Sequence, residues 1–394
     1  MLSNNPTGVP MPYIEERIVH DADSHTMELP NWFDGFGTDR VRKAFRKRYA
    51  NRSLDRIVEE HKSSEYRRFN AQEIMLRKNY DALGAFDSSE RVEALEHIGV
   101  ASQLIFPSSP NVWLEELEHG LDYDLLYETA SATNRAQIAF CSSDPRLLPV
   151  CYVPLADLKR TPGAVEEALK LGAKALLIPW ACPHNHSTSH IELDQLWRQA
   201  EEAGVPILFH VGAADRVLPK AHAINGLPEV PDFHGGEENF RSISYMAIPA
   251  GPMQALSLLI LDGVLDRFPR LRVGVIELGA VWLPGFMRQL EAAFEAFSRH
   301  EDRLQGLNLR PSEYIERQVR VTPYPTEPVA WIIEQSGPDI CMFSSDYPHL
   351  EGGRNPYGRF AKSTAQSTVD AQEGFFRRNF EDLMGSAFTN GSII

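Results

Sequence analysis

The chain has 394 residues, of which 43% are apolar and 24% charged, so it can bury a large core and is too apolar to be disordered. Its formal net charge of -15 at pH 7 excludes nucleic acid and a membrane surface as expected partners, because both require a concentrated basic face. No window approaches the roughly 18 apolar residues of a membrane helix, and four scattered cysteines predict reduced thiols. We therefore expect a cytoplasmic protein that acts on a small molecule.

The predicted elements alternate between strand and helix along the chain. The first predicted strand, "RIVHDAD", is followed over residues 38–80 by a strongly charged stretch with a helical pattern, which we interpret as an insertion. Seven further strands are predicted at "ASQLIFPSS", "RLLPVCYVPLAD", "AKALLIPW", "VPILFHVG", "LRVGVIELG", "RQVRVTPY" and "DICMFSSDYPH". Helices are predicted between them over residues 91–99, 123–140, 162–172, 191–204, 238–267, 281–299 and 326–336.

Eight strands that alternate with helices indicate a parallel sheet covered by helices on its outside. The pattern predicts an α/β fold, a (β/α)8 TIM barrel in which residues 1–394 form one domain, with the helical insertion after strand 1. In such a barrel the active site lies at the carboxyl ends of the strands. The polar residues that end each apolar run are therefore the candidate site.

Polar side chains at the ends of three strands have the chemistry of a metal site. Asp23 and His25 are two residues apart on a strand and point to the same side, with Asp21 one step deeper. His210 ends the fifth predicted strand and Asp346 the eighth. A single histidine at such a place is more often a hydrogen-bonded group at the barrel rim. In combination, Asp23, His25, His210 and Asp346 predict a site for zinc or manganese with nitrogen and oxygen ligands.

Further candidates lie in the predicted loops at the same end of the barrel. Glu277 and His349 end strands six and eight, so they are candidate catalytic residues beside Asp346, although His349 could equally only orient Asp346. The loop "PHNHSTSH" could face the substrate, bind metal or lie on the surface. Aromatic side chains in these loops could form the walls of a pocket for a flat substrate, or they could only pack against the rest of the protein. An arginine in these loops could pair with a substrate carboxylate, or it could lie on the surface. These candidates are Trp32, Phe106, Trp180, Trp282, Tyr324 and Arg354.

Several motifs, taken together, resemble one enzyme family. In chain order, "DADSH", "LGAKALLIP", "EEAGVPILFHVG", "DRFPRLRVGVIELGAVWLP" and "FSSDYPHLEGG" are similar to the amidohydrolase-related family that includes aminocarboxymuconate semialdehyde decarboxylase and hydroxybenzoate decarboxylases. The resemblance covers nearly the whole chain from residue 18 onward. It implies a TIM barrel of the metal-dependent hydrolase type, with His210 and Asp346 as metal ligands and Asp346 able to handle a proton.

Two positions depart from the pattern that the resemblance implies. Family members usually open with His-x-His, or Glu-x-His in some decarboxylases, where this chain has Asp23 and His25. Characterised decarboxylases have a histidine beside the metal where this chain has Glu277, and the two side chains differ in resting charge and in how they move protons. Manganese gains over zinc as carboxylates replace imidazoles.

Two reaction classes suit these residues. The first is non-oxidative decarboxylation of a small aromatic or unsaturated carboxylic acid, in which Asp346, assisted by Glu277 or His349, delivers a proton to carbon. The alternative is hydrolysis of a C–N, C–O or activated C–C bond at the same metal, with Asp346 or Glu277 as base, and Glu277 favours this alternative. A metal-free binding protein is a third, weaker hypothesis.

The carboxy-terminal segment "AQEGFFRRNFEDLMG" has the pattern of an amphipathic helix. Its apolar side chains could support a homodimer or cap the barrel.

Overall fold

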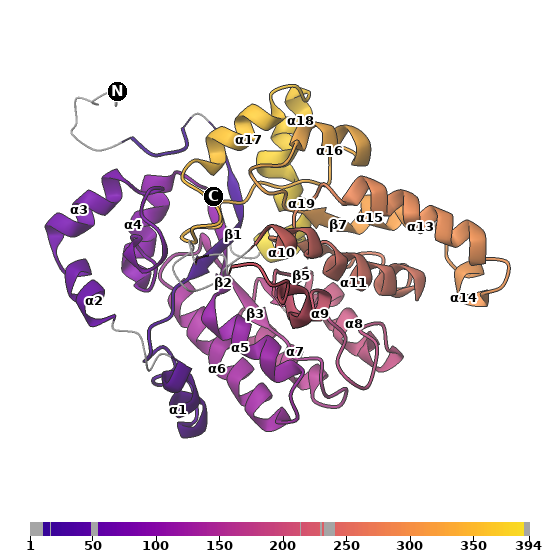
Figure 1. The fold of residues 1–394 in the computed structure, drawn as a ribbon, viewed down its shortest axis with the longest axis horizontal. Coiled ribbons are helices and arrows are strands. Elements are labelled where there is room, and N and C mark those ends of the chain that lie inside the picture. Colours follow the sequence, from indigo (N-terminus) through magenta and orange to yellow (C-terminus); the bar gives the residue numbers. More distant parts are fainter. Residues whose placement is uncertain are drawn as a thin grey trace.

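The structure is a computed structural model that describes residues 11–15, 17–48, 54–212, 214–228, 231 and 241–389. Seven parallel strands pair in sequential order to form one sheet (Figure 1). They are β1 His20–Thr26, β2 Ser102–Pro107, β3 Leu147–Tyr152, β4 Ala175–Leu177, β5 Ile207–Phe209, β6 Val273–Val275 and β7 Val319–Val321. Every residue in these strands is buried, as expected of a parallel sheet covered by helices.

The predicted eighth strand, residues 339–349, is irregular but connects the two edges of the sheet. On one side, the backbone N–H of Met342 donates to the carbonyl of Val321 in β7 at 2.8 Å. On the other side, the N–H of Ala22 in β1 donates to the carbonyl of Phe343 at 3.1 Å. The molecule therefore has a TIM-barrel-like α/β fold in which an irregular segment takes the place of the eighth strand.

Helices surround the strands (Figure 1). They are α1 Asp39–Arg48, α2 Asp55–His61, α3 Ser64–Gln72, α4 Ser88–Ile98, α5 Ser109–Glu118, α6 Tyr123–Cys141, α7 Thr161–Leu171, α8 Asp194–Ala203, α9 Ala214–Val217, α10 Ser242–Ala247, α11 Ala250–Leu261, α12 Val264–Arg267, α13 Leu283–Phe297, α14 Asp302–Gln305, α15 Pro311–Gln318, α16 Val329–Ser336, α17 Pro356–Thr364, α18 Val369–Glu373 and α19 Asn379–Thr389. Short helical turns of other types are η1 Asn79–Asp81, η2 Ile191–Leu193, η3 Lys220–Ala223 and η4 Gly374–Arg378.

The charged stretch over residues 38–80 forms helices α1, α2 and α3, which lie to one side of the sheet (Figure 1). Val41 and Phe45 of α1 are fully buried in a small apolar cluster with Phe33 and Trp113, while the charged residues of α1 face outward. This amphipathic pattern explains why so polar a sequence still packs. That the stretch is an insertion into the barrel stays a prediction.

The predicted helix over residues 238–267 is broken in the structure. Pro249 has no N–H to continue a helix, and Gly263 takes a left-handed backbone with φ 75°, so α10, α11 and α12 are separate. Residues 238–240 lie outside the described part of the chain. Contrary to the sequence expectation, residues 242–261 are long and apolar enough to cross a membrane by length and composition. One face of α11 instead packs into the core.

The carboxy-terminal segment caps the barrel. Phe375, Phe376, Phe380 and Leu383 are at most 1% exposed, and the carbonyl of Phe375 accepts a hydrogen bond of 2.9 Å from the N–H of Phe343. The barrel therefore covers the apolar face that could have supported a homodimer.

Candidate metal centre

β1 delivers two side chains to the candidate site through a local irregularity. Its pairing with β2 shifts between Asp21 and Ser24, so β1 holds one extra residue there, which is a β-bulge. Bulges re-aim side chains and are common beside active sites. Beyond the bulge, Asp23 and His25 are each 1% exposed and their side chains approach one another, while Ser24 donates a hydrogen bond to the carbonyl of Leu104 in β2 at 2.8 Å.

Asp21, one step deeper, holds the eighth-strand segment against β1. Its carboxylate accepts hydrogen bonds from the N–H and hydroxyl of Ser345 at 2.8 and 2.6 Å and from the amide of Gln103 at 2.9 Å. Burial raises the pKa of Asp21 to about 7, although these hydrogen bonds oppose the shift. Because Ser345 precedes Asp346, Asp21 fixes the place from which Asp346 reaches the site.

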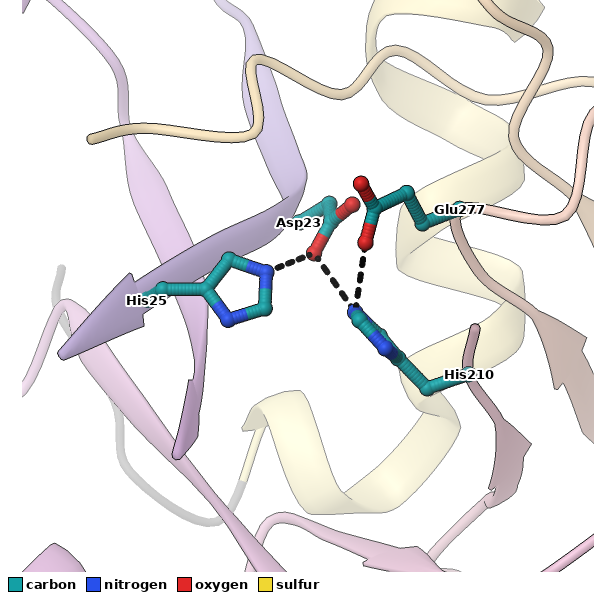
Figure 2. A group of neighbouring side chains, drawn as sticks. All are labelled: Asp23, His25, His210 and Glu277. Atoms are coloured by element: carbon teal, nitrogen blue, oxygen red, sulfur yellow. Dashed lines mark hydrogen bonds and ion pairs between the residues drawn. The ribbon is translucent and has the colours of Figure 1, made fainter. Parts of the chain in front are cut away.

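Four side chains from three strands converge at the carboxyl end of the sheet (Figure 2). Oδ1 of Asp23 lies 3.1 Å from Nε2 of His25 and 3.3 Å from Nε2 of His210. Oε2 of Glu277 lies 3.4 Å from the same His210 nitrogen. One ligand atom from each of the four residues lies within 4.8 Å of all the others. Ligands at about 2.0–2.2 Å from one ion lie up to about 4.4 Å apart, so the group needs only small movements to enclose a metal.

Asp346 and His349 adjoin this group on the side of His25. Oδ1 of Asp346 lies 3.5 Å from Nε2 of His25 and 3.0 Å from Nδ1 of His349. His25 and His349 stack with their ring centroids 3.9 Å apart. Together with Glu277 these three residues form a second group whose ligand atoms lie within 4.8 Å of one another. The structure thus brings together all the predicted metal and catalytic residues.

The residues present have the properties that a divalent metal requires. Oδ2 of Asp23, both ring nitrogens of His25 and both carboxylate oxygens of Asp346 are buried and make no hydrogen bond to the described residues. Unsatisfied buried polar atoms cost free energy, which a bound cation would offset. Burial and the neighbouring imidazoles of His349 and His210 lower the pKa of His25 well below its usual value, so this ring is neutral and can donate a lone pair.

Backbone strain is concentrated at the same place. Glu277 has a backbone φ of 54° and Asp346 one of 52°, and residues other than glycine rarely adopt such positive values. Hydrogen bonds hold both conformations: the N–H of Glu277 donates to Oγ1 of Thr322 at 2.8 Å, and that of Asp346 to the carbonyl of Asp23 at 2.9 Å. Strained backbone persists only where the surrounding structure holds it in place, and it is common at functional sites.

A cavity opens beside the cluster. None of the described residues that line it is a lysine or arginine. Much of its wall comes from the loop after β2, the first turn of α5 and the segment at η1, and the sequence interpretation missed the last two of these. The lining residues are His25, Asn79, Pro107, Ser108, Ser109, Asn111, Val112, His210, Val211, Glu277, His349 and Glu351.

Two of the predicted aromatic residues lie at the site, although neither lines the cavity. Phe106 packs beneath the ligand group, with its ring centroid 4.6 Å from that of His210 and 5.7 Å from that of His25. Tyr324 donates a hydrogen bond of 2.7 Å to the carbonyl of Glu277 and so helps to hold its strained backbone.

The structure does not bring the other predicted substrate-binding residues to the cavity. The indole N–H groups of Trp180 and Trp282 donate hydrogen bonds to loop backbone instead. The first goes to the carbonyl of Gly212 at 3.2 Å and the second to the carbonyl of Gly279 at 2.9 Å. Trp32 packs on Phe140 with ring centroids 5.8 Å apart, and Arg354 is exposed. A loop position alone could not separate packing aromatic residues from binding ones.

The histidine-rich loop after β4 is tied to neighbouring backbone. Nε2 of His184 donates to the carbonyl of His119 at 2.6 Å, and Nε2 of His186 to that of Leu155 at 3.0 Å. The groups capable of holding a metal in the described part of the chain include no histidine of this loop.

Ser108 fixes the orientation of His349. Its hydroxyl donates to the carbonyl of Thr26 at 2.7 Å and lies 2.8 Å from Nε2 of His349. This contact holds the ring so that its Nδ1 faces Asp346, at 3.0 Å from Oδ1. Glu28 in turn holds the N–H of Ser108 at 3.0 Å.

Replacing Ser108 by alanine is expected to lower turnover about 10–100-fold, the usual cost of losing a group that orients an active-site histidine. Metal content should stay unchanged, because Ser108 contacts none of the predicted metal ligands directly. Steady-state kinetics with metal analysis measure both quantities, and Ser142→Ala, at an exposed serine after α6, is the control. Wild-type turnover in Ser108→Ala would refute the proposed role.

Comparisons with known proteins identify the family and the fold. A family model described as amidohydrolase matches residues 115–383, and none of the curated proteins matches the chain. An amidohydrolase from Mycobacterium avium subsp. paratuberculosis has a similar structure, with a TM-score of 0.71 and 19% identity over 93% of this chain and 99% of that one.

Two decarboxylases also share the fold. One is 5-carboxyvanillate decarboxylase from Novosphingobium aromaticivorans, complexed with manganese and a nitrobenzoic acid ligand, with a TM-score of 0.61 and 18% identity over 93% of this chain and 95% of that one. The other is a dihydroxybenzoic acid decarboxylase from Polaromonas, with manganese and an inhibitor, with a TM-score of 0.60 and 14% identity over 96% and 100% of the chains. At these identities the likeness concerns the fold.

Proposed function

The chain belongs to the amidohydrolase family, and from that premise we propose that it is a metal-dependent non-oxidative decarboxylase of a small aromatic or unsaturated carboxylic acid. One observation carries the proposal: buried carboxylates and imidazoles with unsatisfied ligand atoms converge at the carboxyl end of the sheet. The manganese-containing decarboxylases with the same fold support it.

In this proposal Asp23, His25, His210 and Asp346 hold the metal, and Glu277 beside His210 is a further candidate ligand. The ion, when bound, supplies positive charge that holds and polarises the substrate's carboxylate and an adjacent oxygen. With Glu277 included, the set has three carboxylates and two imidazoles, so manganese suits it better than zinc.

Asp346 is the proposed proton donor. It delivers a proton to the carbon that carries the carboxylate, the carbon–carbon bond breaks, and CO2 leaves. Asp346 regains a proton through His349, whose Nδ1 lies 3.0 Å from Oδ1 of Asp346. Asp346 is only 6% exposed, which limits the access of bulk water to that proton.

A metal-dependent hydrolase of a C–N, C–O or activated C–C bond is the second candidate, and two observations favour it. Glu277 stands where the resemblance implies a histidine, and its carboxylate is a suitable base. The described cavity lining includes Glu277 and Glu351 but no lysine or arginine, so a neutral substrate meets less repulsion than an anionic one.

The two reactions are separated by their products. The full chain, loaded with manganese or zinc, is incubated with a panel of aromatic and unsaturated carboxylic acids, and with their amides and esters, in water labelled with heavy oxygen. A decarboxylase releases CO2 and leaves no label in the organic product, whereas a hydrolase incorporates the label. Glu277→Gln should lower hydrolysis about 10²–10⁴-fold if Glu277 is the base. Glu277→His should preserve decarboxylation, and no CO2 from any acid with either metal would refute the first proposal.

A further inference from the structure

The first turn of α5 brings a polar side chain to the cavity that the proposed reaction does not use. Asn111 is 5% exposed and lines the cavity together with His25 and His349. Its Oδ1 is buried and makes no hydrogen bond to any residue that the structure describes. Buried amide oxygens nearly always have a partner, because an unpaired one costs free energy. This acceptor is therefore open to a hydrogen-bond donor on whatever occupies the cavity.

The local fold gives the Asn111 side chain no structural task. The carboxylate of Glu28 already accepts the N–H groups of Ser108 and Ser109, each at 3.0 Å, where α5 begins. Pro110 fixes the backbone of the first turn. Asparagine is a poor helix former, so alanine or leucine would suit the helix better. The amide is best explained by what enters the cavity.

The surroundings of Asn111 indicate a neutral partner. Pro107, Val112 and Val211 give the described cavity wall an apolar surface for a ring or short chain, and Ser109 is uncharged. Because no described lysine or arginine lines the cavity, a second carboxylate would find no counter-ion there. A hydroxyl group, by contrast, can donate its proton to the amide oxygen.

We propose that Asn111 is a specificity-determining residue, whose Oδ1 accepts a hydrogen bond from a substrate hydroxyl group that does not bind the metal. The substrate class is then a hydroxylated carboxylic acid whose hydroxyl lies away from the reacting carboxylate. This inference rests on the proposed function, which places the carboxylate at the metal cluster. Sites that hydrogen-bond a substrate hydroxyl group discriminate against the analogue that lacks this hydroxyl by up to about 10⁵-fold. One such hydrogen bond to Asn111 predicts that the hydroxylated compound binds about tenfold or more tightly than its parent.

The test measures affinity and CO2 release in parallel on the full, manganese-loaded chain. The probes are benzoate and its meta- and para-hydroxy derivatives, together with benzene and phenol, which lack the carboxylate. Calorimetry or competition gives the gain in affinity that each hydroxyl brings. We expect at least one hydroxylated probe to bind about tenfold more tightly than its parent. Asn111→Leu and Asn111→Ala should reduce this ratio to about one, whereas Asn111→Asp, which keeps an acceptor, should retain it.

The controls separate this inference from the proposed function. Glu116→Gln, on the exposed face of the same helix, should leave the hydroxyl preference unchanged. A hydroxyl preference that depends on Asn111 without CO2 release would support the inference and count against decarboxylation. CO2 release with the same preference in wild type and both apolar variants would overturn the inference alone. No hydroxyl preference with any probe would also overturn it.

Discussion

Replacing His210 by alanine is expected to abolish turnover and to weaken metal binding by at least about a hundredfold, because losing even an outer partner of a ligand costs up to that much. Nε2 of His210 lies 3.3 Å from Asp23 and 3.4 Å from Glu277, so it connects the ligand groups of β1 and β6. Without it, the carboxylates of Asp23 and Glu277 remain close together with no imidazole between them. Metal content after dialysis and turnover of the reloaded protein measure the two effects.

Two further variants make the result decisive. Asp23→Ala should lose metal in the same way, because its Oδ1 lies within 3.3 Å of both His25 and His210. His300→Ala, at an exposed histidine after α13, should keep the metal content of the native chain. One equivalent of metal retained in both His210→Ala and Asp23→Ala would contradict the metal site and both reactions proposed for it.

Replacing Lys78 by methionine is expected to raise the free energy of unfolding by about 3 kcal/mol at pH 7, because burial lowers the pKa of the lysine amine to about 8 and so disfavours its charged form. Lys78 precedes η1, and its Nζ is buried and makes no hydrogen bond to the described residues. Burial lowers its pKa to about 8, although the carboxylate of Asp346 opposes the shift. Methionine has a similar length and no charge to bury.

The gain from Lys78→Met should depend on pH in a defined direction. Below about pH 8 the lysine is charged in the folded and in the unfolded chain, so the folded wild type is destabilised by the whole free energy of burying the charged amine. Between about pH 8 and 10.5 the unfolded chain keeps a proton that the folded chain has released, so wild-type stability rises with pH relative to the variant. Above this range the advantage of methionine disappears.

Urea unfolding at several pH values tests this prediction. Lys62→Met, at an exposed lysine of the same helical region, should change stability little at any pH. A Lys78→Met variant that is no more stable than wild type at pH 7, or whose gain does not depend on pH, would show that the amine is well solvated.

The fold followed from the sequence where local pattern and burial agree. Six largely apolar runs become buried parallel strands, because a sheet covered by helices requires apolar residues on both faces, while the seventh strand, β1, is buried although most of its residues are polar. The sequence pattern failed at residues 238–267, where Pro249 and Gly263 interrupt one continuous apolar pattern. It also failed at the eighth strand, whose residues pair with both sheet edges yet are not regular strand.

The convergence of the candidate ligands was predictable from topology. Asp23 and His25 lie within β1, His210 and Glu277 lie just after β5 and β6, and Asp346 lies in the segment that takes the place of the eighth strand. Parallel strands in a barrel end at one face, so these side chains meet there. The sequence also contained the residue types that bind metal, since carboxylates and imidazoles are readable without coordinates.

Only the tertiary structure showed what completes the site. Ser108, Asn111 and Lys78 became candidates through a contact or an unpaired buried atom, and neither is visible in a residue type. The bulge in β1 and the left-handed backbone of Glu277 and Asp346 are equally invisible, because packing from distant segments imposes them against local preference. The sequence thus determined which chemistry gathers at the end of the barrel, through periodicity and residue type. The tertiary structure decided which side chains touch, because distances and burial depend on segments far apart in the chain.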